Sequence, residues 1–269
     1  MTESQDNLFN LGGKIAVVTG GSRGIGRAIA LRLAQHGAKV MVSSRKIDAC
    51  QKVVDEIRRR GGEADAQACN IADKEQLRAL VDGTLKRFGG IDVLVCNAAV
   101  NPYFGPSLKM SDEAFDRVMG CNVRSNFQLV NMVLPTMLDR GGGSIIVISS
   151  VGGFVGSDVM GAYSISKAAD MQLVRNIAVE WGERNVRANC IAPGLIRTDF
   201  ARALWENDKI LESTVCNTPM KRIGEADEVA GSAVFLASPA SGYMNGQTLV
   251  IDGGRLAGIP RAQLSDAGA

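Results

Sequence analysis

A tyrosine and a lysine lie four positions apart in the chain, at Tyr163 and Lys167. In a helix this spacing places both side chains on one face. An isolated phenol has a pKa of about 10 and is a poor general base at neutral pH, but a neighbouring ammonium group favours the phenolate and lowers that pKa. The pair could therefore exchange a proton with a substrate oxygen, although a surface Tyr–Lys pair without a function would show the same spacing.

Polar residues at three other positions could take part in such chemistry. Ser149 and Ser150 follow an apolar segment at 145–148, at the carboxyl end of an expected strand, where open α/β sheets bind their ligands. A hydroxyl there can donate a hydrogen bond to an oxygen on which negative charge develops, or it can do no more than end the strand before the next glycine turn. Asn122 lies within an expected helix, where asparagine is unfavourable, so its presence indicates a special hydrogen bond.

A glycine-rich turn follows the first expected strand. Gly20, Gly24 and Gly26 come directly after the apolar residues 15–19 and before a helical pattern. Glycine permits a positive φ and leaves backbone N–H groups accessible, and a helix that begins at such a turn directs its partial positive charge at an anion. Strand, turn and helix in this order predict a dinucleotide site. The spacing is G-x-x-x-G-x-G rather than G-x-G-x-x-G, and an ordinary tight turn is the alternative.

The residues after the second expected strand indicate which dinucleotide binds. NAD-binding folds carry an acidic residue about 20 positions beyond the glycine turn, where it receives the ribose hydroxyls. The chain has Ser44, Arg45 and Lys46 at this place and no carboxylate. Arg45, together with Arg23 of the glycine turn, could pair with a 2′-phosphate, because arginine binds phosphate through strong, directional hydrogen bonds. We therefore expect NADP(H) rather than NAD(H).

Strand and helix patterns alternate along the chain and predict the elements that position these residues. Continuous apolar segments predict strands buried on both faces, and amphipathic segments predict helices. The expected strands are 14–19, 39–44, 63–70, 93–97, 144–149, 187–192 and 248–252, and the expected helices are 26–36, 48–60, 74–88, 111–138, 162–181 and 226–236.

This alternation predicts an α/β fold, namely a single Rossmann-like, doubly wound parallel sheet of about seven strands with helices on both faces. Residues 1–269 are expected to form one domain, with a substrate-binding loop at 194–222 and a C-terminal tail at 255–269.

Composition excludes several classes of function. With 30 basic and 28 acidic residues, the net charge of +2 gives no electrostatic reason to bind nucleic acid or an anionic membrane. No segment is apolar over a length that spans a bilayer, and the polar start does not look like a secretory signal. The six cysteines are scattered, which predicts reduced thiols in a cytoplasmic protein and no metal site. His36, the only histidine, precedes Gly37 at an expected helix end and is interpreted as structural.

The motifs together resemble those of the classical short-chain dehydrogenase/reductase family over residues 11–254. The matching positions are Thr19-Gly20-x-x-x-Gly24-Ile25-Gly26, Asn97-Ala98-Ala99, Asn122, Ser150, Tyr163-x-x-x-Lys167 and Pro193-Gly194. This combination, in this order, is far more specific than any single motif. The family usually has glycine at the position of Ala99 and aspartate at that of Asn70; neither departure removes the chemistry, since an amide still donates and accepts hydrogen bonds.

The resemblance implies a role for each site residue. The catalytic set would be Ser150, which binds the substrate oxygen; Tyr163, the proton donor and acceptor; Lys167, which also holds the nicotinamide ribose; and Asn122, which holds a water in a proton relay behind Lys167. The cofactor-binding residues would be Gly20, Ser22, Arg23, Gly24, Ile25, Gly26, Ser44, Arg45, Asn70, Ile71, Asn97, Ala98, Ala99, Tyr163, Lys167, Pro193, Gly194, Ile196 and Thr198. For Thr198 a helix N-cap is the alternative. A homotetramer is also implied.

These observations predict an NADP(H)-dependent oxidoreductase that interconverts a carbonyl and a secondary alcohol. A small-molecule substrate with an apolar body is expected from the loop residues Val100, Tyr103, Phe104, Phe154, Met160, Phe200 and Leu204. The alternatives are an NAD-dependent alcohol dehydrogenase of the same family, a catalytically silent nucleotide-binding regulator, and a sugar-nucleotide epimerase or dehydratase on a related fold. The last class usually carries a longer C-terminal substrate domain than the residues after Gly254 could form.

Overall fold

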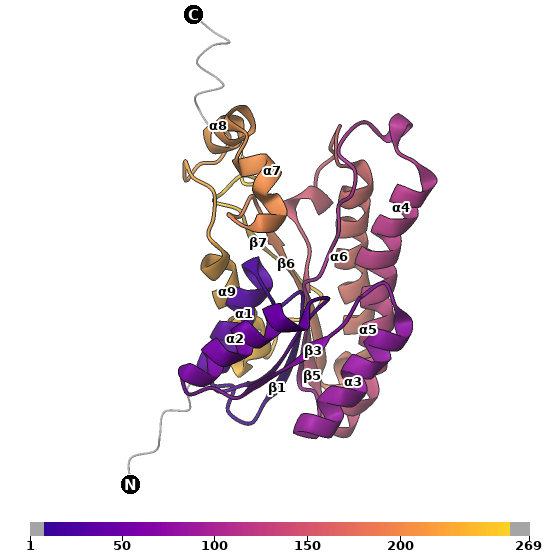
Figure 1. Ribbon diagram of the computed structural model, residues 1–269, viewed down its shortest axis with the longest axis vertical. Helices are drawn as coiled ribbons and strands as arrows, with labels where there is room; N and C mark the ends of the chain where they lie inside the picture. The colour runs from indigo at the N-terminus through magenta and orange to yellow at the C-terminus, as the bar shows by residue number, and fades with distance from the viewer. Residues whose placement is uncertain (1–7, 259–269) are drawn as a thin grey trace, which may run out of the picture.

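Seven short segments rich in aliphatic residues pair into one sheet (Figure 1). The computed structural model describes residues 8–258. The strands are β1 (Ile15–Thr19), β2 (Lys39–Ser44), β3 (Ala64–Ala68), β4 (Val93–Cys96), β5 (Gly143–Ile148), β6 (Val186–Pro193) and β7 (Thr248–Ile251). β1 and β4 are buried along their whole length, as expected of strands that are covered on both faces.

The strand order is β3-β2-β1-β4-β5-β6-β7, and all neighbouring strands are parallel. The order reverses at β1, because the chain first adds β2 and β3 on one side and then returns to add β4 on the other. Open sheets of this kind bind ligands at such a reversal, beyond the carboxyl ends of the strands. The predicted doubly wound sheet is confirmed, and its topology makes the ends of β1 and β4 the place for a cofactor.

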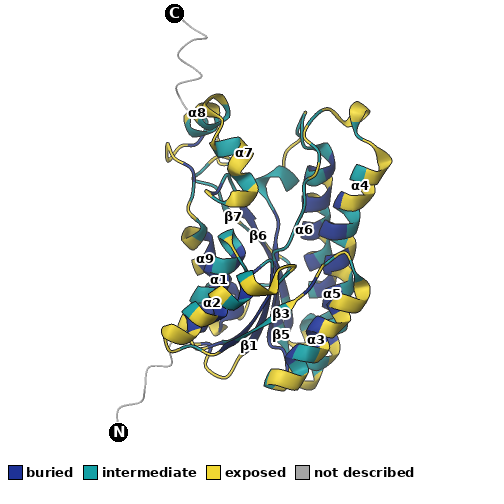
Figure 2. Ribbon diagram, viewed as in Figure 1, coloured by how far each residue is buried: buried dark blue, intermediate teal, exposed yellow. Residues whose placement is uncertain are grey.

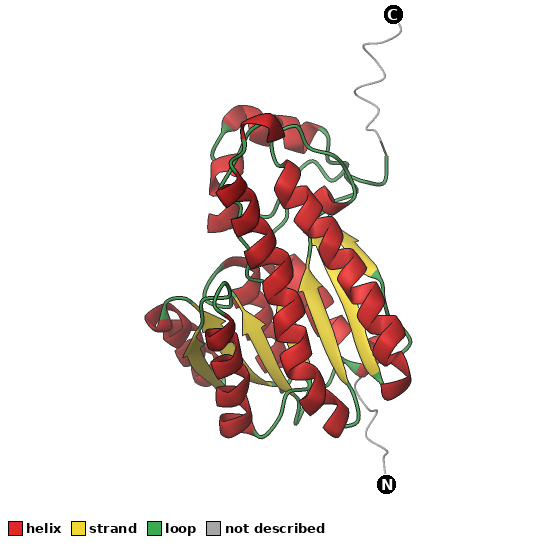
Figure 3. Cartoon of the chain, turned by 90° about the vertical axis from the view of Figure 1, so that its right-hand side faces the viewer, coloured by secondary structure: helices red, strands yellow, loops and turns green. Residues whose placement is uncertain are grey.

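Helices cover both faces of this sheet (Figures 1 and 3). On one face lie α1 (Gly24–Gln35), α2 (Ile47–Arg59) and α9 (Ala226–Ala237); on the other lie α3 (Lys74–Phe88), α4 (Asp112–Met119), α5 (Ser125–Asp139) and α6 (Gly161–Trp181). Two shorter helices, α7 (Arg202–Trp205) and α8 (Asp208–Cys216), stand beyond the carboxyl ends of the strands. None of the helices within residues 8–258 is both long and apolar enough to cross a membrane.

Each face of the sheet packs into its own apolar core. In β5, Ile146 and Ile148 belong to the core that includes α1, α2 and α9, whereas Ile145 and Val147 belong to the core formed with α3, α5 and α6. Figure 2 shows the buried residues concentrated on the strands and on the inner sides of the helices. Because both faces are packed, the strand ends that carry the site are held in place from two sides.

Segment 111–138 is not the single helix that its pattern predicts. A five-residue π-helical turn, Gly120–Arg124, separates α4 from α5. Side chains from the next turn bond to its carbonyls: the Oγ of Ser125 donates to Cys121, and the Nδ2 of Asn126 donates to Asn122. Such π turns are frequent at functional sites, and this one carries a predicted catalytic residue, Asn122.

Two further expectations are corrected by the structure. The third strand is shorter than 63–70, because the backbone N–H of Asn70 bonds to the side chain of Gln76 instead of a neighbouring strand. The expected loop 194–222 contains the 3-10 helix η5 (Asp199–Ala201) as well as α7 and α8, since Thr198 and Asn207 act as N-caps. Most of the predicted tail, residues 259–269, lies outside the described part of the chain.

Candidate active site

The segment from the end of β1 into the first turn of α1 leaves no room for a side chain at Gly20 or Gly26. Gly20 and Gly24 have φ angles of 64° and 54°. A Cβ on Gly20 would lie 2.7 Å from the Nδ2 of Asn97, and a Cβ on Gly26 would run into the same amide and into the carbonyl of Gly20. Because α1 begins here, its N-terminal N–H groups and partial positive charge face the turn, and no acidic residue in its first turn offsets that charge. The residues present therefore fit the pyrophosphate of a dinucleotide.

Asn97 joins the end of β4 to this turn. Its Nδ2 donates to the carbonyls of Thr19 (2.9 Å) and Gly20 (3.2 Å). The backbone N–H groups of Asn97 and Ala98 both donate to the Oγ1 of Thr19, at 3.0 and 3.2 Å. The amide of Asn97 thus supports the turn, and Ala98 and Ala99 follow it at the crevice.

The residues predicted to hold the adenosine half follow β2 and β3. Ser44 ends β2, and its carbonyl accepts from the backbone N–H of Cys69, which keeps the two strand ends together. Arg45 is exposed, whereas Arg23 lies 3.6 Å from a carboxylate oxygen of Asp199 in η5. Asn70 is also exposed at this edge. The two arginines therefore differ in their surroundings: Arg23 already has an acidic neighbour, whereas Arg45 is exposed to solvent.

The residues after β6 have distinct positions. Pro193 is the last residue of the strand, and the backbone N–H of Gly194 donates to the carbonyl of Ile251 at 2.9 Å. Both lie at the carboxyl end of the sheet, as predicted. The side chain of Ile196, in contrast, is only 5% exposed and packs in the core, so this residue could meet a cofactor only through its backbone.

Thr198 lies directly beside the glycine turn. A Cβ on Gly24 would come within 3.2 Å of the Cγ2 of Thr198, which places this threonine against the start of α1. Its Oγ1 also accepts from the backbone N–H of Ala201 at 3.4 Å. Thr198 therefore caps η5, as the alternative interpretation predicts, and it also lies next to the glycine turn; its contact with a cofactor stays a prediction.

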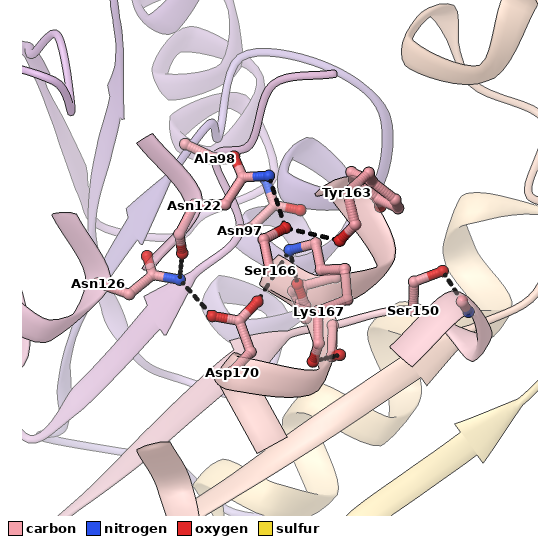
Figure 4. A network of polar contacts seen from close by, with 12 residues as sticks. Asn97, Ala98, Asn122, Asn126, Ser150, Tyr163, Ser166, Lys167 and Asp170 are labelled. Atoms are coloured by element: carbon pink, nitrogen blue, oxygen red, sulfur yellow. Dashed lines mark hydrogen bonds and ion pairs between the residues drawn. The ribbon is translucent and has the colours of Figure 1, made fainter. Parts of the chain in front are cut away.

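Tyr163 and Lys167 share one face of α6 (Figure 4). The Nζ of Lys167 lies 5.7 Å from the centroid of the Tyr163 ring and donates to the carbonyl of Ile148 at 2.8 Å. Lys167 is buried and Tyr163 is partly exposed. The predicted pair is therefore present, with a buried ammonium beside a phenol that a substrate can reach.

The two serines at the end of β5 take different roles. The Oγ of Ser149 donates to the carbonyl of Lys167 at 2.7 Å, which ties β5 to α6. The Oγ of Ser150 accepts from the backbone N–H of Gly152 at 3.1 Å. That bond uses a lone pair of Ser150 and leaves its hydroxyl proton for a ligand.

Asn122 connects the π turn to α6 and to the loop after β4. Its Nδ2 donates to the carbonyl of Val100 (3.0 Å) and to the Oγ of Ser166 (3.1 Å), and its Oδ1 accepts from the backbone N–H of Val100 at 2.9 Å. The Oγ of Ser166 donates in turn to the carbonyl of Tyr163 at 2.7 Å. The side chain of Asn122 thus holds the first turn of α6, and its own carbonyl faces Asn126.

Two residues that the sequence analysis did not single out complete this network (Figure 4). The Oδ2 of Asp170 accepts from the Nζ of Lys167 at 3.0 Å, and its Oδ1 accepts from the Nδ2 of Asn126 at 2.9 Å. Asp170 lies three positions after Lys167, and Asn126 lies four after Asn122. This helical spacing was a signal in the sequence that each shares a face with a predicted site residue.

Burial and charge act against each other in the Lys167–Asp170 pair. Burial favours the neutral amine of Lys167, but the charges of Asp170 and Tyr163 and the hydrogen bond to Asp170 outweigh it, so the pKa of Lys167 is raised above its ordinary value. Burial raises the pKa of Asp170, and the charge of Lys167 and the amide of Asn126 oppose that rise. The ammonium form of Lys167 therefore depends on its buried carboxylate.

His36 has no place in this site. It follows the last residue of α1 as its C-cap, and its backbone N–H bonds to the carbonyls of Arg32 and Leu33. Since α1 starts at the glycine turn, its end lies at the opposite edge of the sheet. Within residues 8–258 no group of three histidine, cysteine or acidic residues could hold a metal ion.

The predicted substrate walls are only partly brought together. The ring of Phe200, in η5, lies 6.3 Å from that of Tyr163, and Phe200 and Phe104 are each 53% exposed. Phe154 lies elsewhere: it lines a separate hollow of about 520 Å³ with Arg175 of α6 and with residues 245–248, at the start of β7. Phe200 is therefore near Tyr163, Phe154 lines a different hollow and is not part of the predicted wall, and the role of Phe104 stays a prediction.

Comparison with known proteins shows relatives over most of the chain. Residues 20–255 match a family model described as enoyl-(acyl carrier protein) reductase. Dehydrogenase/reductase SDR family member 4 of Bos taurus is 42% identical over 246 residues, covering 91% of this chain and 88% of the bovine protein.

Two solved structures are equally close in shape. A 7α-hydroxysteroid dehydrogenase complexed with NADH and 7-oxo glycochenodeoxycholic acid has a TM-score of 0.90 and 39% identity, covering 94% of this chain and 98% of the other. A gluconate 5-dehydrogenase from Burkholderia cenocepacia, in complex with NADP and tartrate, has a TM-score of 0.90 and 33% identity with the same coverage. The residues that match the family model, 20–255, include the glycine turn and all of α6, which carries Tyr163.

Proposed function

Because the chain belongs to the short-chain dehydrogenase/reductase family and is an NAD(P)-dependent enzyme acting on CH–OH groups, we propose that it interconverts a carbonyl and a secondary alcohol with NADP(H). Tyr163 is the general acid and base of this proposal. The observation that carries it is the buried ammonium of Lys167, 5.7 Å from the Tyr163 ring at the carboxyl edge of the sheet.

The side chains at this edge divide the work of proton transfer. When bound, the nicotinamide supplies or accepts the hydride. In reduction Tyr163 donates its proton to the substrate oxygen, and in oxidation it removes that proton. Ser150 donates a hydrogen bond from its free hydroxyl to the same oxygen, keeps its own proton, and so stabilises the charge that develops there. Lys167 stabilises the phenolate left on Tyr163, because opposite charges attract strongly at a buried site.

The cofactor would be held along the reversal of the strand order. The N–H groups after Gly20 and at the start of α1 would bind the pyrophosphate. Arg45, exposed at the end of β2, would bind the 2′-phosphate that distinguishes NADP, and no carboxylate follows Ser44 to favour NAD. One of the two solved relatives was crystallised with NADH and the other with NADP, so both cofactors occur on this fold.

The proposed substrate is a small molecule with an apolar body. Phe200 lies beside Tyr163, and Phe104 is exposed in the loop after β4. A steroid-like ring would suit such walls, and the 7α-hydroxysteroid dehydrogenase was solved in complex with 7-oxo glycochenodeoxycholic acid. A cytoplasmic location and a homotetramer belong to the same proposal.

Replacing Tyr163 with phenylalanine tests this function. Tyr163→Phe removes only the hydroxyl, so we expect kcat to fall about 100-fold or more on a carbonyl panel followed by NADPH absorbance, while NADPH still binds. Tyr243→Phe is the control, because that phenol is fully exposed on the surface. Undiminished turnover in Tyr163→Phe would refute the mechanism, and NADPH binding by the wild type without turnover of any carbonyl would favour the silent regulator.

A further inference from the structure

A buried carboxylate lies behind the proposed catalytic pair. The side chain of Asp170 is 0% exposed and that of Lys167 is 3% exposed, and 3.0 Å separates their charged atoms. Burying either charge alone would be strongly unfavourable, so each depends on the other. The carbonyl of Ile148, the second acceptor for Lys167, carries only a partial charge and cannot replace the carboxylate.

Among the titratable groups around Lys167, Asp170 supplies the negative charge that pairs with its ammonium. Cys96 of β4 and Cys190 of β6 face the pair from the sheet, and burial followed by the charge of Asp170 raises the pKa of both thiols, which keeps them neutral. On α6 itself, the charge of Tyr163 contributes to the raised pKa of Lys167, and the charge of Arg175 opposes the rise in the pKa of Cys190. Among these groups only Asp170 contacts the ammonium with a carboxylate.

Asn126 holds this carboxylate from the opposite helix. Its Nδ2 donates both to the Oδ1 of Asp170 (2.9 Å) and to the carbonyl of Asn122 (2.7 Å). Asn126 is itself only 5% exposed. The side chains of Asn126 and Asp170 therefore link the backbone carbonyl of Asn122 to the ammonium of Lys167 (Figure 4).

We propose that Asp170, oriented by Asn126, is a positioning residue that keeps Lys167 charged and holds its ammonium beside Tyr163. The proposal rests on the proposed function, since it concerns how Lys167 supports the phenolate. Without the carboxylate, Lys167 loses the largest of the contributions that oppose burial, and burial then favours the neutral amine. A neutral amine no longer stabilises the phenolate, so proton transfer through Tyr163 would require a higher pH.

The test is Asp170→Asn, which removes the charge with little change in shape. The ligand-free protein is titrated by near-ultraviolet phenolate absorbance. The signal of Tyr163 is isolated by difference from Tyr163→Phe, which is practical in a chain with three tyrosines. We expect the Tyr163 transition to move to higher pH by about one unit or more, and the kcat/KM profile for alcohol oxidation to move with it, with about tenfold less activity at neutral pH.

Two control variants separate charge from packing. Asp170→Glu restores a carboxylate and is expected to return the transition toward that of the wild type. Asp92→Asn removes another buried carboxylate. Asp92 directly precedes β4, at the amino ends of the strands, and pairs with Arg140. This variant is expected to leave the Tyr163 transition unchanged. If Asp170→Asn does not fold, Asn126→Leu takes its place, with a smaller shift expected in the same direction.

An unchanged transition, or one that moves to lower pH, would overturn the proposal. The second result would mean that Lys167 stays charged without Asp170 and that the carboxylate only weakens its effect on the phenol. Failure of this proposal can be distinguished from failure of the proposed function. If Tyr163→Phe is inactive but the transition does not move in Asp170→Asn, only the role of Asp170 is wrong; if Tyr163→Phe retains full turnover, the function itself is wrong.

Discussion

At the scale of single residues, the site depends on side chains that are already bonded before any ligand arrives. Ser149 ties β5 to α6, Asn97 supports the glycine turn, and Asn122 holds the first turn of α6 through Val100 and Ser166. These bonds leave few groups to adjust when a substrate binds. Such preorganisation is what electrostatic stabilisation of a developing charge requires.

Arg45 carries the prediction about cofactor selectivity. A charge-assisted contact to phosphate is worth about 1.5–3 kcal/mol, so Arg45→Ala should weaken NADP binding about 10- to 100-fold and leave NAD binding within about twofold. Dissociation constants measured by calorimetry for both cofactors check this. Arg59→Ala, at an exposed position on α2, should change neither constant. A wild type that does not prefer NADP would show the assignment to be wrong.

At the scale of secondary structure elements, the π turn and the capped helices decide where functional side chains point. The π turn places Asn122 inward at a point where a regular helix would carry on from α4 into α5. α6 then presents Tyr163, Lys167 and Asp170 along one side, from the partly exposed phenol to the fully buried carboxylate. The exposure of the site residues therefore decreases along α6, from Tyr163 to Asp170.

The N-terminus of α9 gives a prediction of pH dependence. Glu228 accepts from both terminal nitrogens of Arg222 (2.7 Å each) and from the backbone N–H of Glu225 (2.9 Å), and these bonds lower its pKa from 4.5 to about 2. A carboxyl group whose pKa is lowered by folding stabilises the protein at pH values above its ordinary pKa. This stability is lost as the pH falls through the ordinary pKa toward the lowered one. Glu228→Gln should therefore unfold at a lower temperature than the wild type at neutral pH.

The difference in Tm between Glu228→Gln and the wild type should shrink as the pH falls from 4.5 to about 2. Thermal unfolding followed by circular dichroism across that range measures it. Glu212→Gln, at an exposed position on α8, is the matched control. A difference that persists unchanged at the acid end would contradict the assigned role of the Arg222 contact.

At the scale of the whole molecule, one central sheet connects two cores, and the site lies where the strand order reverses. The predicted consequence is that β5, in the interior of the sheet, matters more for stability than the edge. Ile146→Ala should cost about 2–5 kcal/mol, because the fully buried side chain leaves a cavity beneath α1 and α9.

Val250→Ala on the edge strand β7, where the side chain is 38% exposed, should cost clearly less than Ile146→Ala. Urea denaturation of both variants tests this ranking. Equal losses would mean that the two cores do not dominate the free energy of unfolding.

The sequence by itself determined the order of strands and helices, the glycine turn and the Tyr163–Lys167 pair, because each is a local pattern with a fixed period or spacing. Only the tertiary structure decided that Asn126 meets Asp170 across 44 positions, that Ile196 points into the core, and that Phe154 lines a different hollow. The π turn belongs to the same group. The physical reason is that these features depend on which distant elements pack together, and local periodicity carries no information about the partner across the interface.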